Sequence, residues 1–183
     1  GVRIGSNTIL REHATVHAAS KPDVPTIIGD KVFMMVCSHA GHDAKVGNNV
    51  ILANSTLLAG HTQVADNATL SGNTSVHQFT RIGRMAFISG NSAVAMDVPP
   101  FCVMAFRNTL TGINLVGLRR AGVPREHITA VREAFRAVFW QNMIRKELIA
   151  ELERRGKDCP LVQEQAEFCA GAKRSIAHGR RGM

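Results

Sequence analysis

Apolar residues recur at every sixth position through the first half of this chain, from Ile28 to Val94. The residue four places after each of them is small or β-branched, so every hexad holds two positions suited to a narrow interior. The apolar positions are Ile28, Met34, Ala40, Val46, Leu52, Leu58, Val64, Leu70, Val76, Ile82, Ile88 and Val94. A six-residue period matches neither the 3.6-residue turn of a helix nor the two-residue alternation of a plain strand.

This period is typical of a left-handed parallel β-helix, in which three flat faces of six residues make one coil. The predicted fold class is mainly β: a left-handed parallel β-helix, or hexapeptide-repeat solenoid, followed by a small α-helical C-terminal unit. One coil cannot close a core alone, so coils stack on one another. Residues eighteen apart in the sequence should therefore lie above one another, about 4.8 Å apart.

The hexad ladder extends backwards through Val16 and Leu10 to Ile4. We therefore expect the sequence to lack the N-terminal coils of a longer solenoid. Pro22, within the segment 20–25, falls on a core position. Because proline cannot donate to a strand ladder, this segment is interpreted as a loop that protrudes at a corner.

Three regions are predicted along the chain: a β-helix over 1–100, a connecting segment over 101–123 and a helical C-terminal domain over 124–183. The connecting segment is expected to be irregular or extended. Apolar spacing predicts helices over about 125–140 and 142–155, and a third helix from near Pro160. The basic tail from His178 to Met183 is expected to be disordered.

Charge and cysteine usage narrow the function classes. The net charge of +8 arises mainly after Arg107, which fits either solvated helical faces or docking of an acidic protein or a phosphate ligand. Nucleic acid is not expected as a partner. The four cysteines lack CxxC spacing, which favours a reducing compartment, here the cytoplasm. No signal peptide or membrane-spanning run is recognised.

Coil arithmetic brings scattered histidines together. Eighteen residues after His42 is Gly60, and eighteen after that is Gln78. His61 and His77 each lie one residue from this series, so all three histidines should share one corner of consecutive coils. His39 lies half a hexad before His42. The pattern indicates a histidine-lined cleft; the alternative is a row of surface histidines without function.

Within this cleft His42 and Asp43 form the sharpest candidate pair. A histidine near neutral pH can remove a proton from a sugar hydroxyl, and a carboxylate can orient its ring. Asp43 can instead be a simple turn residue. Gly60 could offer a backbone N–H to an oxyanion, or could be present because a corner needs positive φ. Several histidines could also bind zinc, but no matching glutamate is visible, so no metal is expected.

A set of motifs resembles one acyltransferase family. The motifs are Met35–Asp43, Val46–Asn48, Ile51–Asn54, Leu58–His61, Val76–Phe79, Asp97–Pro100, Gly112–Asn114 and Gly117–Arg120. They look like those of the acyl-ACP:UDP-N-acetylglucosamine O-acyltransferases of lipid A biosynthesis, and they occur in family order over most of residues 1–140. A hexapeptide repeat alone is shared by many transferases, so these motifs carry the resemblance.

The resemblance implies roles for individual residues. His42 matches the catalytic base and Asp43 its orienting acid, while Gly60 matches a backbone donor to the thioester carbonyl. Gly90 falls where the family sets acyl-chain length. The other implied substrate-binding residues are His39, His61, His77 and Gln78 in the pocket, and Asn114 and Arg120 at the nucleotide. Two family residues of the nucleotide loop are replaced, by Val116 and Ala121.

The implied reaction moves a (R)-3-hydroxyacyl chain from acyl carrier protein to the 3-hydroxyl of UDP-N-acetylglucosamine, the first step of lipid A biosynthesis. No cofactor is expected, because the phosphopantetheine of acyl carrier protein delivers the acyl chain. A homotrimer with active sites between subunits is also implied. Two alternatives stay open: N-acyl transfer to a related UDP-amino sugar, and a truncated, inactive solenoid that serves as a binding or assembly module. A metal hydro-lyase is a further, remote alternative.

Overall fold

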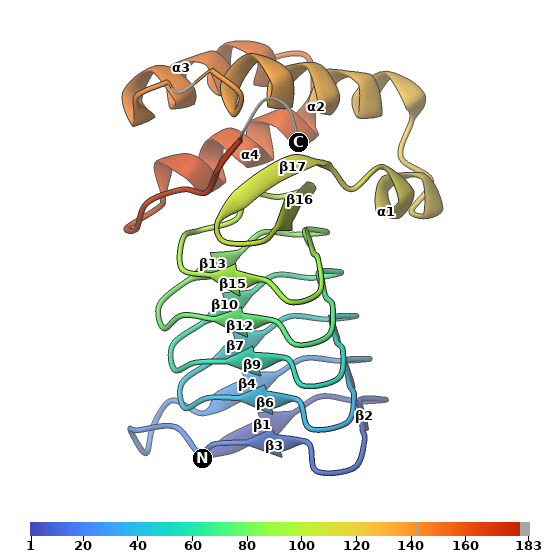
Figure 1. Ribbon diagram of the computed structural model, residues 1–183, viewed down its shortest axis with the longest axis vertical. Coiled ribbons are helices and arrows are strands. Elements are labelled where there is room, and N and C mark those ends of the chain that lie inside the picture. The colour runs from blue at the N-terminus through green and yellow to red at the C-terminus, as the bar shows by residue number, and fades with distance from the viewer. Residues whose placement is uncertain (142, 180–183) are drawn as a thin grey trace.

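The computed structural model describes residues 1–141 and 143–179, and its first part is a prism of three parallel sheets (Figure 1). This arrangement confirms the predicted left-handed parallel β-helix with a helical C-terminal part. Sheet A contains β1 (Val2–Ile4), β4 (Thr26–Ile28), β7 (Lys45–Val46), β10 (Gln63–Val64) and β13 (Arg81–Ile82). Sheet C contains β3 (Thr15–Val16), β6 (His39–Ala40), β9 (Leu57–Leu58), β12 (Ser75–Val76) and β15 (Ala93–Val94).

Sheet B is the longest of the three and continues into the C-terminal half of the chain. It contains β2 (Ile9–Leu10), β5 (Phe33–Met34), β8 (Ile51–Leu52), β11 (Thr69–Leu70), β14 (Phe87–Ile88), β16 (Cys102–Ala105), β17 (Thr109–Ile113) and β18 (His178–Gly179). Strands of successive coils pair in parallel at the predicted separation of eighteen residues, as Lys45 does with Gln63. All hexad positions from Ile28 to Val94 are buried, because their side chains fill the prism.

A residue with positive φ stands at every corner of the prism. Its values lie between 54° and 62° from Lys31 to Asn91, with one such residue every six positions. Several are neither glycine nor asparagine, including His61 and Phe79, so the left-handed conformation is held against its local cost. Most of these residues are held by a hydrogen bond from their backbone N–H to the coil below: that of His61, for example, donates to the carbonyl of His42 at 2.9 Å.

The first coil is longer than the others. Ile4 pairs with Ile28 and Thr15 with His39, a separation of twenty-four residues instead of eighteen. The extra hexad leaves the prism as a loop between β3 and β4, in which Pro22 is exposed. The predicted protruding loop is thus confirmed, and we call residues 18–25 the insertion loop.

The connecting segment is more regular than predicted. β16 and β17 form an antiparallel hairpin, and helix α1 (Leu115–Arg120) follows. The two strands agree with the expectation of an extended connection over 101–123, whereas helix α1 was not expected. The sequence did contain a signal for the start of α1, because Asn114 is its N-cap residue. Asn114 Oδ1 accepts the N–H of Gly117 at 2.9 Å.

Three helices cover one end of the prism (Figure 1): α2 (Arg125–Val138), α3 (Arg145–Gly156) and α4 (Pro160–Ala170). They agree with the three predicted helices, although α3 begins three residues later than expected, and Asn142 lies outside the described residues. The predicted disorder of the tail is wrong for His178 and Gly179, because they form β18 beside β17. Residues 180–183 lie outside the described part. No described helix has the length and apolarity to cross a bilayer.

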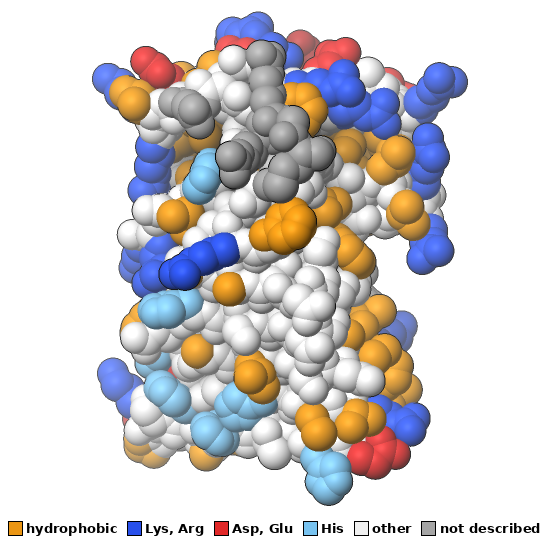
Figure 2. All heavy atoms as spheres, in the orientation of Figure 1, with side chains coloured by type: hydrophobic (Ala, Val, Ile, Leu, Met, Phe, Trp, Pro, Cys, Tyr) orange, Lys and Arg blue, Asp and Glu red, His pale blue; other side chains and the backbone are white. Residues whose placement is uncertain are grey.

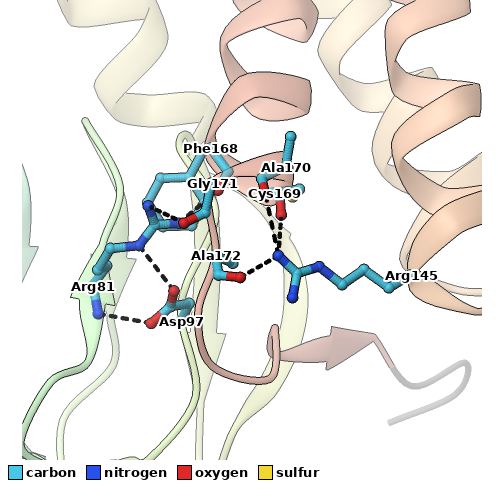
Figure 3. A network of polar contacts seen from close by, with 8 residues as sticks. All are labelled: Arg81, Asp97, Arg145, Phe168, Cys169, Ala170, Gly171 and Ala172. Carbon is cyan, nitrogen blue, oxygen red and sulfur yellow. Dashed lines mark hydrogen bonds and ion pairs between the residues drawn. The ribbon is translucent and has the colours of Figure 1, made fainter.

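Two arginines bind carbonyls at the end of α4, and one of them, Arg81, joins the helical unit to the prism (Figure 3). The Arg81 guanidinium donates to the buried carboxylate of Asp97 at 2.9 Å and to the carbonyls of Phe168 and Gly171 at the end of α4. Arg145 donates to the carbonyls of residues 169, 170 and 172. These contacts satisfy the carbonyls that a helix leaves without partners at its C-terminus, and positive charge is favourable there.

Candidate active site

The corner between sheets C and A holds most of the predicted site residues. We call residues 41–43, 59–61 and 77–79 the histidine corner; they connect β6 to β7, β9 to β10 and β12 to β13. Figure 2 shows histidine side chains gathered on one side of the solenoid. The corner includes His42, Asp43, Gly60, His61, His77 and Gln78, so coil arithmetic placed these residues on the same edge of the prism.

His42, Asp43 and His61 form a compact cluster at this corner. Nδ1 of His42 lies 2.7 Å from Oδ2 of Asp43, and Nε2 of His61 lies 3.6 Å from the same oxygen. The rings of His42 and His61 meet edge to face with centroids 5.1 Å apart. Because the Asp43 carboxylate faces Nδ1, the neutral ring of His42 carries its proton there and leaves Nε2 as the basic nitrogen.

Asp43 is held from several sides although it stands at a turn. Its Oδ1 accepts the N–H of Ser20 at 3.1 Å, and its own N–H donates to the Thr26 hydroxyl at 2.8 Å. The hydrogen bond to His42, aided by those to Ser20, lowers the pKa of Asp43 to about 2. The carboxylate is therefore ionised at neutral pH and stabilises an imidazolium at His42.

Phe79 completes the cluster; it belongs to a motif noted in the sequence but was not predicted as a site residue. Its ring stacks on that of His61 with centroids 4.6 Å apart and 8° between the planes. A signal was available, because Phe79 follows His61 by one coil of eighteen residues. Asp43, His61 and Phe79 thus occupy one column of left-handed corner positions.

A glycine is needed at position 60 because the His42 ring lies close to its backbone, and not because of its φ angle. A Cβ at this position would lie 2.6 Å from Cε1 and Nε2 of the His42 ring. The left-handed residue of the turn is His61, so the alternative that Gly60 supplies a positive φ is wrong. No acceptor for the Gly60 N–H occurs within residues 1–141 and 143–179.

Two other predicted pocket histidines make contacts of their own. His39 is on the outer side of β6, where its Nδ1 lies 2.8 Å from the Thr15 hydroxyl and its ring 4.5 Å from that of His17. Burial, and then the proximity of His17, lowers the pKa of His39. His77 donates from Nδ1 to the carbonyl of Gln78 at 3.1 Å.

A groove of about 540 Å³ opens beside the histidine corner, towards sheet A. Asp43, His61 and Phe79 contribute to its lining, and so do several basic side chains. The basic residues include Lys45 on sheet A, together with Lys173 and Arg174 from the segment after α4. The sequence did not place residues 173 and 174 near the histidines, because the contact joins segments more than a hundred residues apart.

The remaining predicted site residues lie at the other corners of the same chain. Gly90 is exposed at the corner between β14 and β15, where sheet B meets sheet C. Asn114 donates to the carbonyl of Met85, at the corner where sheet A meets sheet B. Arg120 is exposed in the last turn of α1. One chain therefore does not bring Gly90, Asn114 or Arg120 to His42.

The cluster also offers ligand atoms for a metal. One nitrogen each from His42 and His61 and one oxygen of Asp43 lie within 4.8 Å of one another. Two imidazoles and a carboxylate are a donor set that zinc accepts. The same atoms suit acid–base chemistry, and the 2.7 Å contact between His42 and Asp43 is already that of a hydrogen bond.

Comparisons with known proteins agree on one family. Residues 97–177 match the family model described as UDP N-acetylglucosamine O-acyltransferase, domain 2. Curated proteins named acyl-[acyl-carrier-protein]–UDP-N-acetylglucosamine O-acyltransferase are similar over nearly the whole chain. That of Anaeromyxobacter sp. (strain K) is 39% identical over 94% of this chain and 68% of its own length. That of Agrobacterium fabrum is 40% identical over 99% of this chain and 68% of its own length.

Solved structures show the same similarity. The UDP-N-acetylglucosamine acyltransferase of Francisella novicida superposes with a TM-score of 0.91 and 32% identity, covering 98% of this chain and 66% of that one. The enzyme of Campylobacter jejuni gives 0.90 and 34%, covering 98% and 71%. The chain thus spans about two thirds of the length of these relatives.

Proposed function

This chain belongs to the family of acyl-[acyl-carrier-protein]–UDP-N-acetylglucosamine O-acyltransferases, and we propose that it acts in the same way. The reaction transfers a (R)-3-hydroxyacyl chain from acyl carrier protein to the 3-hydroxyl of UDP-N-acetylglucosamine, the first step of lipid A biosynthesis. The observation that carries the proposal is the cluster of His42, Asp43 and His61, which has the geometry of a histidine base with an orienting carboxylate.

In the proposed mechanism Nε2 of His42 removes the proton of the sugar hydroxyl as its oxygen attacks the thioester carbonyl. Asp43 keeps the ring oriented through Nδ1 and stabilises the imidazolium that forms. The tetrahedral intermediate then loses the phosphopantetheine thiolate as its C–S bond breaks. The proton on Nε2 passes to that sulfur, so His42 is neutral again and no cofactor takes part.

Gly60 is the proposed donor to the oxyanion. Its N–H lacks an acceptor among the described residues, and the His42 ring occupies the space that a Cβ at this position would need. A backbone N–H beside the base can stabilise the charge that develops on the carbonyl oxygen. His61 borders both this position and the groove, so it is proposed to contact the substrate.

The groove beside the histidine corner is proposed to receive the acyl donor. Acyl carrier protein is acidic and carries a phosphodiester, so basic side chains such as Lys45, Lys173 and Arg174 are suited to steer it. Arg120 is proposed to bind the diphosphate of the nucleotide, for which a guanidinium offers paired donors. Four free cysteines favour a reducing compartment, and we place the reaction in the cytoplasm.

We further propose that the enzyme is a homotrimer. Predicted substrate-binding residues occupy three different corners of one prism, with His42 at the first, Gly90 at the second and Asn114 over the third. A neighbouring copy related by three-fold symmetry could supply Gly90, Asn114 and Arg120 to the His42 of the first copy. The site between subunits would then contain the whole predicted set.

The test is turnover with acyl-ACP and UDP-N-acetylglucosamine by the wild-type protein, His42→Ala and His127→Ala. We expect His42→Ala to lower kcat by roughly 10² or more without loss of folding, because it removes the base. His127→Ala, on α2, should behave as wild type. Near-normal turnover by His42→Ala would contradict the assignment. Turnover restricted to a 3-amino analogue would favour the N-acyltransferase, and calorimetry that detects neither substrate binding would favour an inactive module.

A further inference from the structure

The left-handed corner residues of the prism make the same type of backbone hydrogen bond, except for Asp43. From Lys31 to Asn91, a left-handed corner residue donates its N–H to a carbonyl of the coil below. His61 donates to His42 and Phe79 to Gly60, and the other corners follow the same pattern. Within the described part of the chain, Asp43 is the exception, because its N–H donates to the side-chain hydroxyl of Thr26 at 2.8 Å.

The insertion loop is the reason for this exception. In the longer first coil, the residue that corresponds to the usual carbonyl acceptor is Ala18, where the chain has begun to leave the prism. Thr26, the first residue of β4, takes over as acceptor and is itself fully buried. Near the other end of the loop, the Ser20 N–H donates to Oδ1 of Asp43 at 3.1 Å.

These contacts decide where the Asp43 carboxylate points. With Oδ1 bound to Ser20, Oδ2 faces the Nδ1 of His42 at 2.7 Å, while Nε2 of His61 lies farther away, at 3.6 Å. A carboxylate that rotated freely could place either oxygen near either histidine. A fixed carboxylate instead selects one tautomer and one ring orientation of His42.

We propose that Ser20, within the insertion loop, and Thr26, directly after it, are positioning residues that orient Asp43 and through it the base His42. The inference rests on the proposed function of His42, but the contacts to Asp43 can be tested independently of it. Thr26 fixes the backbone of Asp43 in its left-handed conformation, and Ser20 fixes one carboxylate oxygen. The loop thereby replaces a structural hydrogen bond with contacts that serve the site.

The first experiment compares Thr26→Val, Thr26→Ser and Thr80→Val. Valine matches threonine in shape but offers no acceptor, so we expect Thr26→Val to lower kcat roughly tenfold with little change in KM, because the base is misplaced. Thr26→Ser keeps the hydroxyl and should restore kcat. Thr80 lies in the same core column, and its hydroxyl has no partner among the described residues, so Thr80→Val should keep wild-type kcat.

The second measurement is amide hydrogen exchange at Asp43, which does not depend on turnover. Thr26→Val should accelerate exchange of the Asp43 N–H and leave that of His61 protected, because His61 donates to a backbone carbonyl. If the wild-type protein transfers no acyl chain, the proposed function falls, while exchange at Asp43 still shows whether Thr26 holds that residue. Unchanged exchange in a folded Thr26→Val variant would overturn the proposal.

Ser20→Pro, with Ser20→Ala as its control, keeps the proposal testable if Thr26→Val fails to fold. Proline removes the N–H that binds Oδ1, while alanine keeps it. We expect Ser20→Pro to lower kcat severalfold and Ser20→Ala, which loses only the hydroxyl, to lower it less. Equal kcat in the two variants would show that the loop does not orient the carboxylate.

Discussion

The ring of His61 lies parallel to that of Phe79, one coil away, with 4.6 Å between centroids. Both residues have left-handed backbone conformations, with φ of 59° and 62°. Since His42 meets the other side of His61 edge to face, His61 is held between two rings. Phe79 remains half exposed on its outer side and lines the groove, so it both supports His61 and borders the proposed donor path.

Phe79→Ala should therefore reduce activity more than stability. Stacked aromatic pairs contribute about 0.5–1.5 kcal/mol beyond burial, so loss of the support should lower kcat/KM up to roughly tenfold. Phe106→Ala is a matched control, because Phe106 is also exposed and left-handed but makes no ring stack among the described residues. Steady-state kinetics and thermal unfolding of both variants check this, and equal kinetics would contradict it.

Gly60→Ala should displace His42 without unfolding the coil. The new Cβ would meet the end of a half-exposed ring at 2.6 Å, and the ring can turn away at little cost in stability. A displacement of about 1 Å can reduce kcat roughly 10²-fold. Gly72→Ala is the control, since Gly72 has the same place in another corner and its Cβ would approach only a carbonyl oxygen at 3.3 Å. Similar kcat values for the two variants would contradict the close-approach role.

The hexad pattern was sufficient to predict the solenoid because the same positions of each hexad are buried in every coil. Every coil buries the same two positions, so a period of six implies three faces and a separation of eighteen. That separation also brought His42 near His61. It did not identify the exact column, which runs through Asp43, His61 and Phe79, because the phase of the left-handed corner is not visible in an apolar pattern.

Other features were missed because they depend on distant segments. The contacts of Thr15 with His39 and of Thr26 with Asp43 follow from the extra hexad, which shifts the register of the first coil to twenty-four. β18 is only two residues long and is stabilised by a strand almost seventy residues earlier. Local propensity carries no information on such pairings.

Asp97→Ala should destabilise the joint between the prism and the helices. The carboxylate is buried and accepts both the backbone N–H and Nε of Arg81 at 2.9 Å, so its removal leaves the guanidinium without a negatively charged partner. Loss of one partner of such a pair costs about 3 kcal/mol of unfolding free energy. Glu164 pairs with Arg84 at the same joint and is more exposed than Asp97. Glu164→Ala should therefore cost about 1 kcal/mol or less. Urea unfolding checks this difference, and equal costs would contradict it.

Asp43→Asn should change how stability depends on acid. The hydrogen bond to His42 lowers the pKa of Asp43 from 3.8 to about 2 in the folded chain, so between these values the unfolded chain binds more protons. Stability therefore rises with pH across this window, and the contribution of Asp43 is lost as pH falls through about 2. The variant lacks this carboxyl, so its unfolding free energy should fall less steeply from pH 4 to pH 2.

Glu151→Gln is a control that changes the acid dependence of stability without touching the candidate active site. Hydrogen bonds from Arg154 and Arg155 lower the pKa of Glu151 to about 2, so this variant should also flatten the acid dependence. Glu151 lies on α3, away from the histidine corner, so Glu151→Gln should keep wild-type turnover, whereas Asp43→Asn should lose it. Denaturant unfolding at several pH values, with kinetics at pH 7, measures both properties. A slope for Asp43→Asn parallel to that of the wild type would show that the hydrogen bond between His42 and Asp43 does not stabilise the folded chain.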